Sequence, residues 1–281
     1  MNVVETIKQF AGETALVDIV ICFAGMSIFS YWLLNSSLGR KSLAGSRPRL
    51  NIMPVYLPFI PLFIWFGTVA IASTIAKRFL PDLPDWRQGY LDNLIFTFSG
   101  LLTVGIIISL ARVYFVERIK GFGLDWRTIV KDFVAAVVNL FAVWPLLIAA
   151  IVLTTRFGQL IWPEFEMKQH QELEMMSQYS NLPLRISVIA VAVMVAPVLE
   201  EMLFRGLFQT MLRSFLPGPW LCIAASSALF AIVHGNPSHW PALFVLAMCM
   251  GYSYEKSGSL LRPIFIHSLF NAATIAAAMS Q

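Results

Sequence analysis

The sequence predicts an all-α, multi-pass membrane protein with about eight transmembrane helices. Of its 281 residues, 58% are hydrophobic and 13% are charged, against roughly 45 to 50% and about 25% in a soluble domain. Most of the chain consists of apolar segments that approach the roughly 20 residues needed to cross a bilayer as a helix. These segments are continuously apolar, whereas the strands of a membrane β-barrel alternate apolar and polar residues. A soluble domain is therefore excluded, and a β-barrel is disfavoured.

The apolar segments give the positions of the expected helices, which are residues 16–34, 54–76, 93–111, 133–155, 184–205, 219–235, 240–254 and 258–279. The first helix lacks a small-residue cleavage site at its end, so we expect a retained helix and not a signal peptide. The three cysteines lie inside apolar segments without CxxC spacing. We expect them to be small buried side chains with no zinc or redox function.

The basic residues predict how the helices are oriented. Twelve Lys and Arg residues fall in loops on one side, chiefly in 35–53 and 112–132, and seven fall on the other side. The richer side is expected to be cytoplasmic. An even number of helices then places both termini outside the cytoplasm. The net charge of +4 is small and scattered, so we expect no nucleic-acid partner.

Ionisable residues divide the chain into two regions of one integrated membrane domain. The first four expected helices have almost no ionisable residue in mid-span, and the last four have several. We therefore expect a four-helix region with an acidic outside loop at 1–183 and a functional helical core at 184–281. The acidic loop at 156–183 is expected to be a solvated connector, with a surface helix as the alternative.

Three charged residues interrupt the fifth expected helix. Glu200, Glu201 and Arg205 lie within six residues of one another, and each charge inside a bilayer costs about 2.5 to 3.5 kcal/mol on insertion scales. Glu201 and Arg205 have the i,i+4 spacing and the order that favour a helical ion pair. Glu200 points elsewhere and lacks that partner. Such a cluster indicates a functional site, although a protonated Glu200 bonded to a neighbouring helix would be a structural alternative.

Two further motifs follow on later helices. Phe230 and His234 are one turn apart at the end of the sixth helix, and His267 and Asn271 are one turn apart in the eighth. A short LPGP link makes helices five and six antiparallel. Glu200 and His234 then lie about 20 and about 24 Å from that link. We therefore expect them to face each other at similar depth, with His267 and Asn271 in the same pocket.

The combined motifs resemble those of the CPBP family, which comprises CAAX prenyl endopeptidases and bacteriocin-processing or immunity proteins, also called ABI proteins. The motifs are EExxxR at Glu200, Glu201 and Arg205, FxxxH at Phe230 and His234, and HxxxN at His267 and Asn271. The resemblance covers about residues 184–279. It implies an intramembrane endopeptidase that cleaves a membrane-associated protein or peptide, which can be lipidated. It also favours a pocket that opens to the cytoplasm.

The resemblance further implies a role for each motif residue. Glu200 and His234 would hold and activate a water molecule, and His267 and Asn271 would stabilise the oxyanion. The supporting residues would be Glu201 and Arg205, as an ion pair, and Phe230, as a wall of the pocket. Besides the substrate, membrane lipids are the expected partners, and no cofactor is expected.

Other functions remain open at the level of sequence. A non-catalytic scaffold or immunity protein could retain the same fold. Glu200, His234 and His267 also form the two-His, one-carboxylate set of some zinc hydrolases, although no HExxH motif is present. A transporter with a proton relay would need paired broken helices, and the sequence shows no such symmetry. Asn271 alone could join helices through a hydrogen bond.

Overall fold

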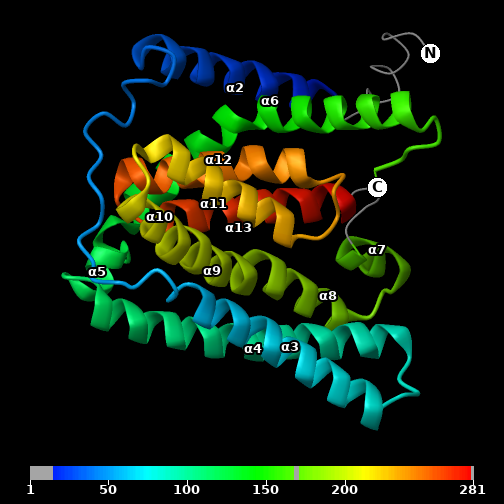
Figure 1. Ribbon diagram of the computed structural model, residues 1–281. Helices are drawn as coiled ribbons and strands as arrows, with labels where there is room; N and C mark the ends of the chain where they lie inside the picture. The colour runs from blue at the N-terminus through cyan, green and yellow to red at the C-terminus, as the bar shows by residue number, and fades with distance from the viewer. Residues whose placement is uncertain (1–14, 168–170, 280–281) are drawn as a thin grey trace.

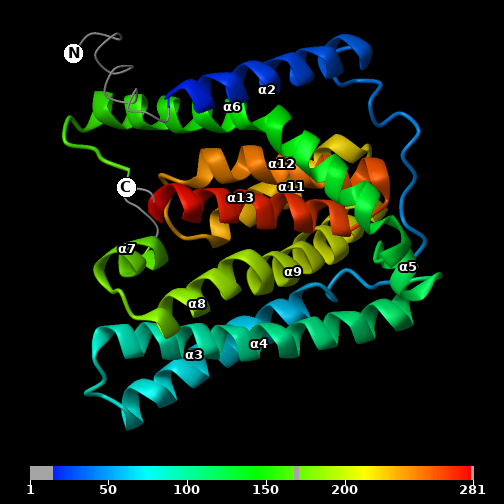
Figure 2. The same ribbon diagram turned by 180° about the vertical axis from the view of Figure 1, so that it is seen from behind.

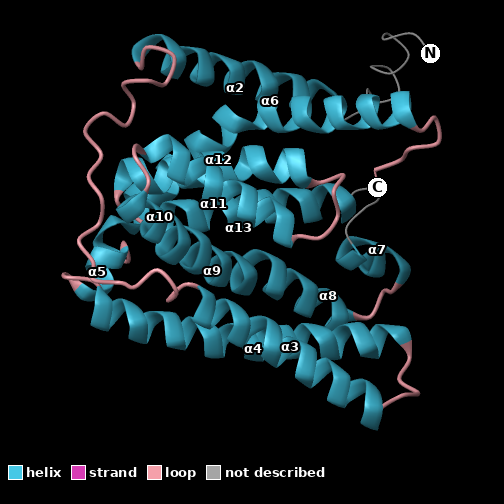
Figure 3. Cartoon of the chain, viewed as in Figure 1, coloured by secondary structure: helices cyan, strands magenta, loops and turns pink. Residues whose placement is uncertain are grey.

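The computed structural model describes residues 15–167 and 171–279. Within these residues the fold is all-α, and Figure 3 shows helices joined by loops. The α-helices are α2 (Ala15–Asn35), α3 (Phe59–Phe79), α4 (Asp85–Tyr114), α5 (Arg118–Phe122), α6 (Ile129–Ile161), α7 (Gln171–Gln178), α8 (Leu182–Ala190), α9 (Ala196–Glu201), α10 (Thr210–Phe215), α11 (Pro219–Val233), α12 (Trp240–Ser257) and α13 (Leu261–Met279). A short 3-10 turn, η1 (Trp126–Thr128), precedes α6, and two π-helical segments, η2 (Val191–Val195) and η3 (Met202–Gln209), join α8, α9 and α10 into one continuous helix.

Each of the eight apolar segments contains a helix, as the sequence predicts, although α3 begins at Phe59 and α13 at Leu261. Among the described residues, four helical stretches are long and apolar enough to cross a membrane: Phe59–Phe79, Asp85–Tyr114, Trp126–Ile161 and Leu182–Phe215. Ile19–Asn35 and Pro219–Val233 are shorter apolar helices. These lengths and compositions make the chain an integral, multi-pass membrane protein. The fifth expected helix is longer than predicted, because π turns carry it through the charged motif to Phe215.

The helices form three layers (Figures 1 and 2). The continuous helix α8–α10 and helices α11, α12 and α13 lie in the middle, the α3–α4 hairpin covers one side, and α2 with the second half of α6 covers the other.

Helix α6 changes direction along its length (Figure 2), and Pro145 lies inside it. A proline removes one backbone hydrogen bond and bends a helix. Gly25 lets α2 approach this bend, because a Cβ there would collide with the Phe141 carbonyl. The first half of α6 therefore reaches α12 and α13 while its second half pairs with α2.

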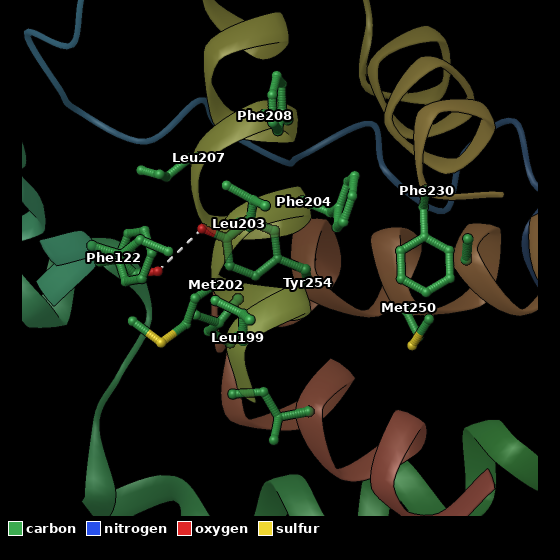
Figure 4. Close-up of a cluster of buried hydrophobic side chains, with 14 of the residues drawn as sticks. Phe122, Leu199, Met202, Leu203, Phe204, Leu207, Phe208, Phe230, Met250 and Tyr254 are labelled. Carbon is green, nitrogen blue, oxygen red and sulfur yellow. Dashed lines mark hydrogen bonds between the residues drawn. The ribbon is translucent and has the colours of Figure 1, made fainter. Parts of the chain in front are cut away.

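The middle layer is buried on every side around the charged motif. All eight residues of η3 are buried, whereas a helix at the surface of the bundle would expose one face. Figure 4 shows the apolar side chains of this segment packed with Phe122 from α5, Phe230 from α11 and Tyr254 from α12. The Tyr254 hydroxyl donates to the Phe122 carbonyl at 3.1 Å. The motif helix is thus fixed by neighbours on all sides.

The basic loops meet at one end of the molecule. The backbone of residues 50–52 pairs with that of residues 114–116, and Lys256 Nζ donates to the Ser42 carbonyl at 2.6 Å. Gly123 has φ of 104° and accepts a hydrogen bond from Leu260 N at 2.8 Å. Loops 35–53 and 112–132 therefore lie together, as expected from alternating helices. Which face of the membrane this end occupies stays a prediction.

The acidic loop is helical over part of its length. Helix α7 packs against α8 and α13, and Met176 is buried there. Arg185 fixes its end by donating to the carbonyls of Met176 and Tyr179. The segment Gln171–Gln178 is therefore helical and packed against the bundle, and whether this helix lies on the membrane surface or is a solvated connector stays a prediction.

Candidate active site

The two adjacent carboxylates lie on α9, between the π-helical segments η2 and η3. Glu200 and Glu201 are both buried, with 8% and 0% of their surface exposed. π-Helical turns are rare and are frequent at functional sites, because they shift the direction of the side chains that follow. Here the two carboxylates are brought to α11 and α13 within one continuous helix.

Glu201 accepts two hydrogen bonds through one oxygen, one from its own helix and one from α13. Its Oε1 accepts from Arg205 NH1 at 2.8 Å and from His267 Nδ1 at 2.9 Å. Arg205 is fully buried and also donates to the Ala247 carbonyl of α12 at 3.2 Å. The predicted i,i+4 pair is therefore present, and it ties the motif helix to α12 and α13. A buried charge pair is tolerated only with such additional hydrogen bonds.

Both histidines have the same proton arrangement. The Phe230 carbonyl lies 2.6 Å from His234 Nδ1, and a carbonyl can only accept, so this nitrogen carries a proton. His267 Nδ1 likewise donates to the Glu201 carboxylate. In the neutral imidazoles each Nε2 is then an acceptor. The hydrogen bond at one ring nitrogen thus sets the chemistry of the other.

These two Nε2 atoms converge on Glu200. Its Oε2 lies 3.6 Å from His234 Nε2 and 4.0 Å from His267 Nε2. The prediction that Glu200 and His234 face each other is confirmed. Both distances exceed that of a hydrogen bond, and this buried oxygen has no hydrogen-bond partner among the described residues. Three acceptors around one point suit a ligand that donates two hydrogens, which a water molecule does.

Phe230 closes one side of this group. The centroid of its ring lies 4.5 Å from that of the His234 ring and 5.7 Å from that of the His267 ring, and Phe230 is fully buried. The Arg205 guanidinium lies 4.6 Å from the same ring, within the range of a cation–π interaction. Phe230 thus holds both imidazoles and the cation in place, as a wall of the predicted pocket would.

Asn271 makes a contact of a different kind. Its Nδ2 donates to the Ala192 carbonyl in η2 at 2.7 Å. Among the described residues, no side-chain hydrogen bond joins it to Glu200 or to either histidine. This bond ties α13 to the helix before the charged motif, as the structural alternative for Asn271 expects. A role in stabilising an oxyanion stays a prediction.

The comparison with known families agrees with these motifs. A family model described as type II CAAX prenyl endopeptidase Rce1-like matches residues 182–273. This part of the chain is an Rce1-like domain. The resemblance to the CAAX endopeptidase family is thereby confirmed for about a third of the chain, including every motif residue. No curated protein and no solved structure matches the chain.

Several residues that support the Rce1-like domain carry no signal in the sequence motifs. Gln209 Nε2 donates to the Gly251 carbonyl of α12 at 3.0 Å, and Ser226 Oγ of α11 donates to the Phe204 carbonyl at 2.9 Å. Asp132 of α6 pairs with Arg262 of α13 at 2.9 Å. Of these residues, only Asp132 carries a signal in the sequence, because it is an acid at the start of an apolar segment. Its partner is 130 residues away, and no local spacing reveals such a pair.

The zinc alternative gains no support from the geometry of the Rce1-like domain. In residues 15–167 and 171–279, no group of three His, Cys, Asp or Glu side chains is placed to hold a metal ion. Each histidine also uses Nδ1 for another partner. Only Nε2 of each ring could then serve as a ligand. Because zinc-bound histidines commonly hold such a second partner, these contacts do not decide the question, and the zinc alternative is left to experiment.

Proposed function

We propose that this protein is an intramembrane endopeptidase that uses a water molecule activated by Glu200 and His234. The observation that carries the proposal is the convergence of Glu200 Oε2 with the Nε2 atoms of His234 and His267 inside an Rce1-like domain. A water molecule that donates to both Glu200 and His234 has its oxygen lone pairs free for attack. General-base catalysis of this kind requires acceptors within hydrogen-bond reach of the water.

These residues account for every proton transferred in the hydrolysis of a peptide bond. The water oxygen forms a bond to the scissile carbonyl carbon, and the proton that it loses passes to Glu200 or His234. The C–N bond then breaks, and the nitrogen of the leaving amine takes up that proton. The products are a carboxylic acid and an amine. No covalent enzyme intermediate is needed, so a serine or cysteine nucleophile has no part.

His267 can stabilise the oxyanion only in one protonation state. Because its Nδ1 proton is bound to Glu201, its Nε2 can donate only from the imidazolium form. Asn271 would be the second donor, because the amide nitrogen that binds the Ala192 carbonyl has another hydrogen. One oxyanion donor is worth about 3 kcal/mol of activation free energy.

We further propose that eight helices cross the membrane, with both termini outside and the active site open to the cytoplasm. The gathering of the basic loops at one end supports this orientation through the positive-inside rule. Residues 1–183 would then surround a catalytic core at 184–281. The substrate class is a membrane-associated protein or peptide, which can carry a lipid.

The experiment that tests the mechanism uses purified wild-type protein with peptides that end in a lipidated or an unlipidated CAAX sequence. We expect cleavage by wild type and loss of more than 99% of it in His234→Ala. A matched control, His239→Ala, changes a histidine in the loop after α11, and it should retain activity. Equal cleavage by all three proteins would refute the proposed base.

A second part of the experiment, metal chelation, distinguishes the proposed mechanism from the zinc alternative. Prolonged treatment with a chelator should leave the cleavage rate unchanged, and elemental analysis should find no stoichiometric zinc. Loss of activity with recovery on adding zinc would replace the proposal with a metallohydrolase. Folded wild-type protein that cleaves none of these peptides would favour the non-catalytic scaffold.

A further inference from the structure

A surface groove lies where the beginning of α6 meets α13. It is lined by Ile129, Val130 and Phe133 of α6 and Phe265 of α13, and its volume is about 350 Å³. The rings of Phe133 and Phe265 meet edge to face, with centroids 5.5 Å apart. Val130 is 74% exposed. All four side chains are apolar, so this α6–α13 groove suits an apolar chain.

Two positively charged residues flank the groove residues Ile129 and Val130 in the sequence. Arg127 and Lys131 are exposed, and within the described part of the chain neither forms an ion pair. Two acids lie nearby in the sequence, and only one of them is paired with a cation. Asp125 accepts from the backbone N–H of Arg127 at 3.1 Å, and buried Asp132 pairs with Arg262 at 2.9 Å. The rim therefore has a net positive charge, with two cations that face solvent.

An exposed tryptophan next to Arg127 indicates the depth of this rim in the membrane. Trp126 is 70% exposed and directly precedes Arg127. Exposed tryptophans of membrane proteins concentrate at the level of the lipid headgroups. Phe133 lies seven residues further along the chain, or about 10 Å deeper along the helix axis. The cations thus lie at headgroup level, and the groove extends below them into the level of the acyl chains.

We propose that the α6–α13 groove binds an anionic phospholipid. The phosphate-bearing headgroup lies against Arg127 and Lys131, and one acyl chain follows Val130, Phe133 and Phe265. A zwitterionic lipid lacks the net charge that the rim selects, and a free phosphate lacks the chain that fills the groove. This inference is independent of the proposed peptidase activity. It gives a lipid direct contact with α13, two residues before His267.

The test measures thermal melts of the purified full-length protein in mild detergent. Phosphatidylglycerol should raise Tm by several degrees more than phosphatidylcholine or glycerol 3-phosphate at equal concentration. Arg127→Gln/Lys131→Gln should weaken the apparent affinity for phosphatidylglycerol at least tenfold. The matched control Arg40→Gln/Lys41→Gln removes two exposed cations from another loop at the same end, and it should bind as wild type does.

A second variant keeps the test decisive if the double variant folds poorly. Val130→Trp fills the groove without a change in charge, and it should lower the retention of phosphatidylglycerol in native mass spectrometry. Three results would overturn the proposal. The first is equal stabilisation of the protein by the two phospholipids. The second is a loss of affinity in the control variant as large as that in the rim variant. The third is displacement of bound phosphatidylglycerol from the groove by an isoprenoid-bearing peptide. The last result would make the groove part of the substrate site.

Discussion

At the scale of residues, charge balance governs the candidate site. Glu200 and Glu201 bring two negative charges, and Arg205 brings one positive charge into a buried group. One additional proton on Glu200 or on one of the histidines that face it would make the group neutral. A buried site avoids net charge because ions are costly away from water. In the proposed reaction, the proton that the water molecule loses would pass to Glu200 or His234 and bring the group to neutrality, so the requirement for stability and the proposed chemistry concern the same atoms.

The supporting ion pair gives the first prediction. Glu201→Gln and Arg205→Ala each leave a buried charge without its partner, so each should lower the free energy of unfolding by about 3 to 5 kcal/mol. Thermal melts of the detergent-solubilised variants measure this loss. Glu117→Gln, at an exposed carboxylate, should change stability little. A Glu201→Gln variant that melts with wild type would show that the pair contributes no net stability.

Asn271 gives the second prediction at this scale. Asn271→Ala leaves the Ala192 carbonyl without its 2.7 Å donor, which costs about 1 to 3 kcal/mol when the group is buried. We expect a lower Tm as well as lower activity. Thr274→Ala, which removes only a bond to a carbonyl of the same helix, is the control. An unchanged Tm for Asn271→Ala would contradict the structural role.

At the scale of elements, periodicity predicts much of the site and fails where the backbone is irregular. Helical spacing correctly pairs Glu201 with Arg205, and rise per residue correctly matches Glu200 with His234. The sequence does not reveal that His267 binds Glu201 or that Asn271 binds Ala192. Both contacts depend on π turns, which have no regular sequence pattern, and on the way α13 packs. The direction of a side chain after such a turn follows from tertiary contacts and not from spacing.

Packing between elements gives the third prediction. A Cβ on Gly251 would lie 2.8 Å from Gln209 Oε1 and 2.9 Å from Ile223 Cγ2, so Gly251→Ala should push α12 away from η3 and α11. We expect a loss of about 1 to 3 kcal/mol, typical of an overpacked core. Gly105→Ala is the matched control, because nothing lies near that position in α4. It should be neutral or stabilising by about 0.5 to 1 kcal/mol. Equal melts for the two variants would contradict the close approach of α12.

At the scale of the whole molecule, the three layers place the Rce1-like domain between two helical regions that its family model does not cover. The sequence predicts all eight helical segments, since long apolar runs have few alternatives in a bilayer. It does not predict the layers. These depend on the bend of α6 near Pro145 and on distant contacts such as Asp132 with Arg262. For the proposed peptidase, the outer helices would therefore constrain the approach of a substrate in ways that the motifs alone do not show.

Orientation gives the fourth prediction. In a background with Cys22, Cys222 and Cys249 replaced, Arg47→Cys and Asp82→Cys place single thiols on exposed loops. Because the basic end is expected inside, an impermeant thiol reagent should label Arg47→Cys only in inside-out vesicles and Asp82→Cys only in right-side-out vesicles. The reverse pattern would place both termini in the cytoplasm.

The measurement that tests the proposed catalysis most directly compares purified wild type with Glu200→Gln. The substitution removes the base while it preserves the size of the side chain, so the variant should melt close to wild type. Mass spectrometry of peptides that end in a CAAX sequence should find defined cleavage products with wild type and none with the variant. Full turnover by folded Glu200→Gln would contradict the role of Glu200 in activating water.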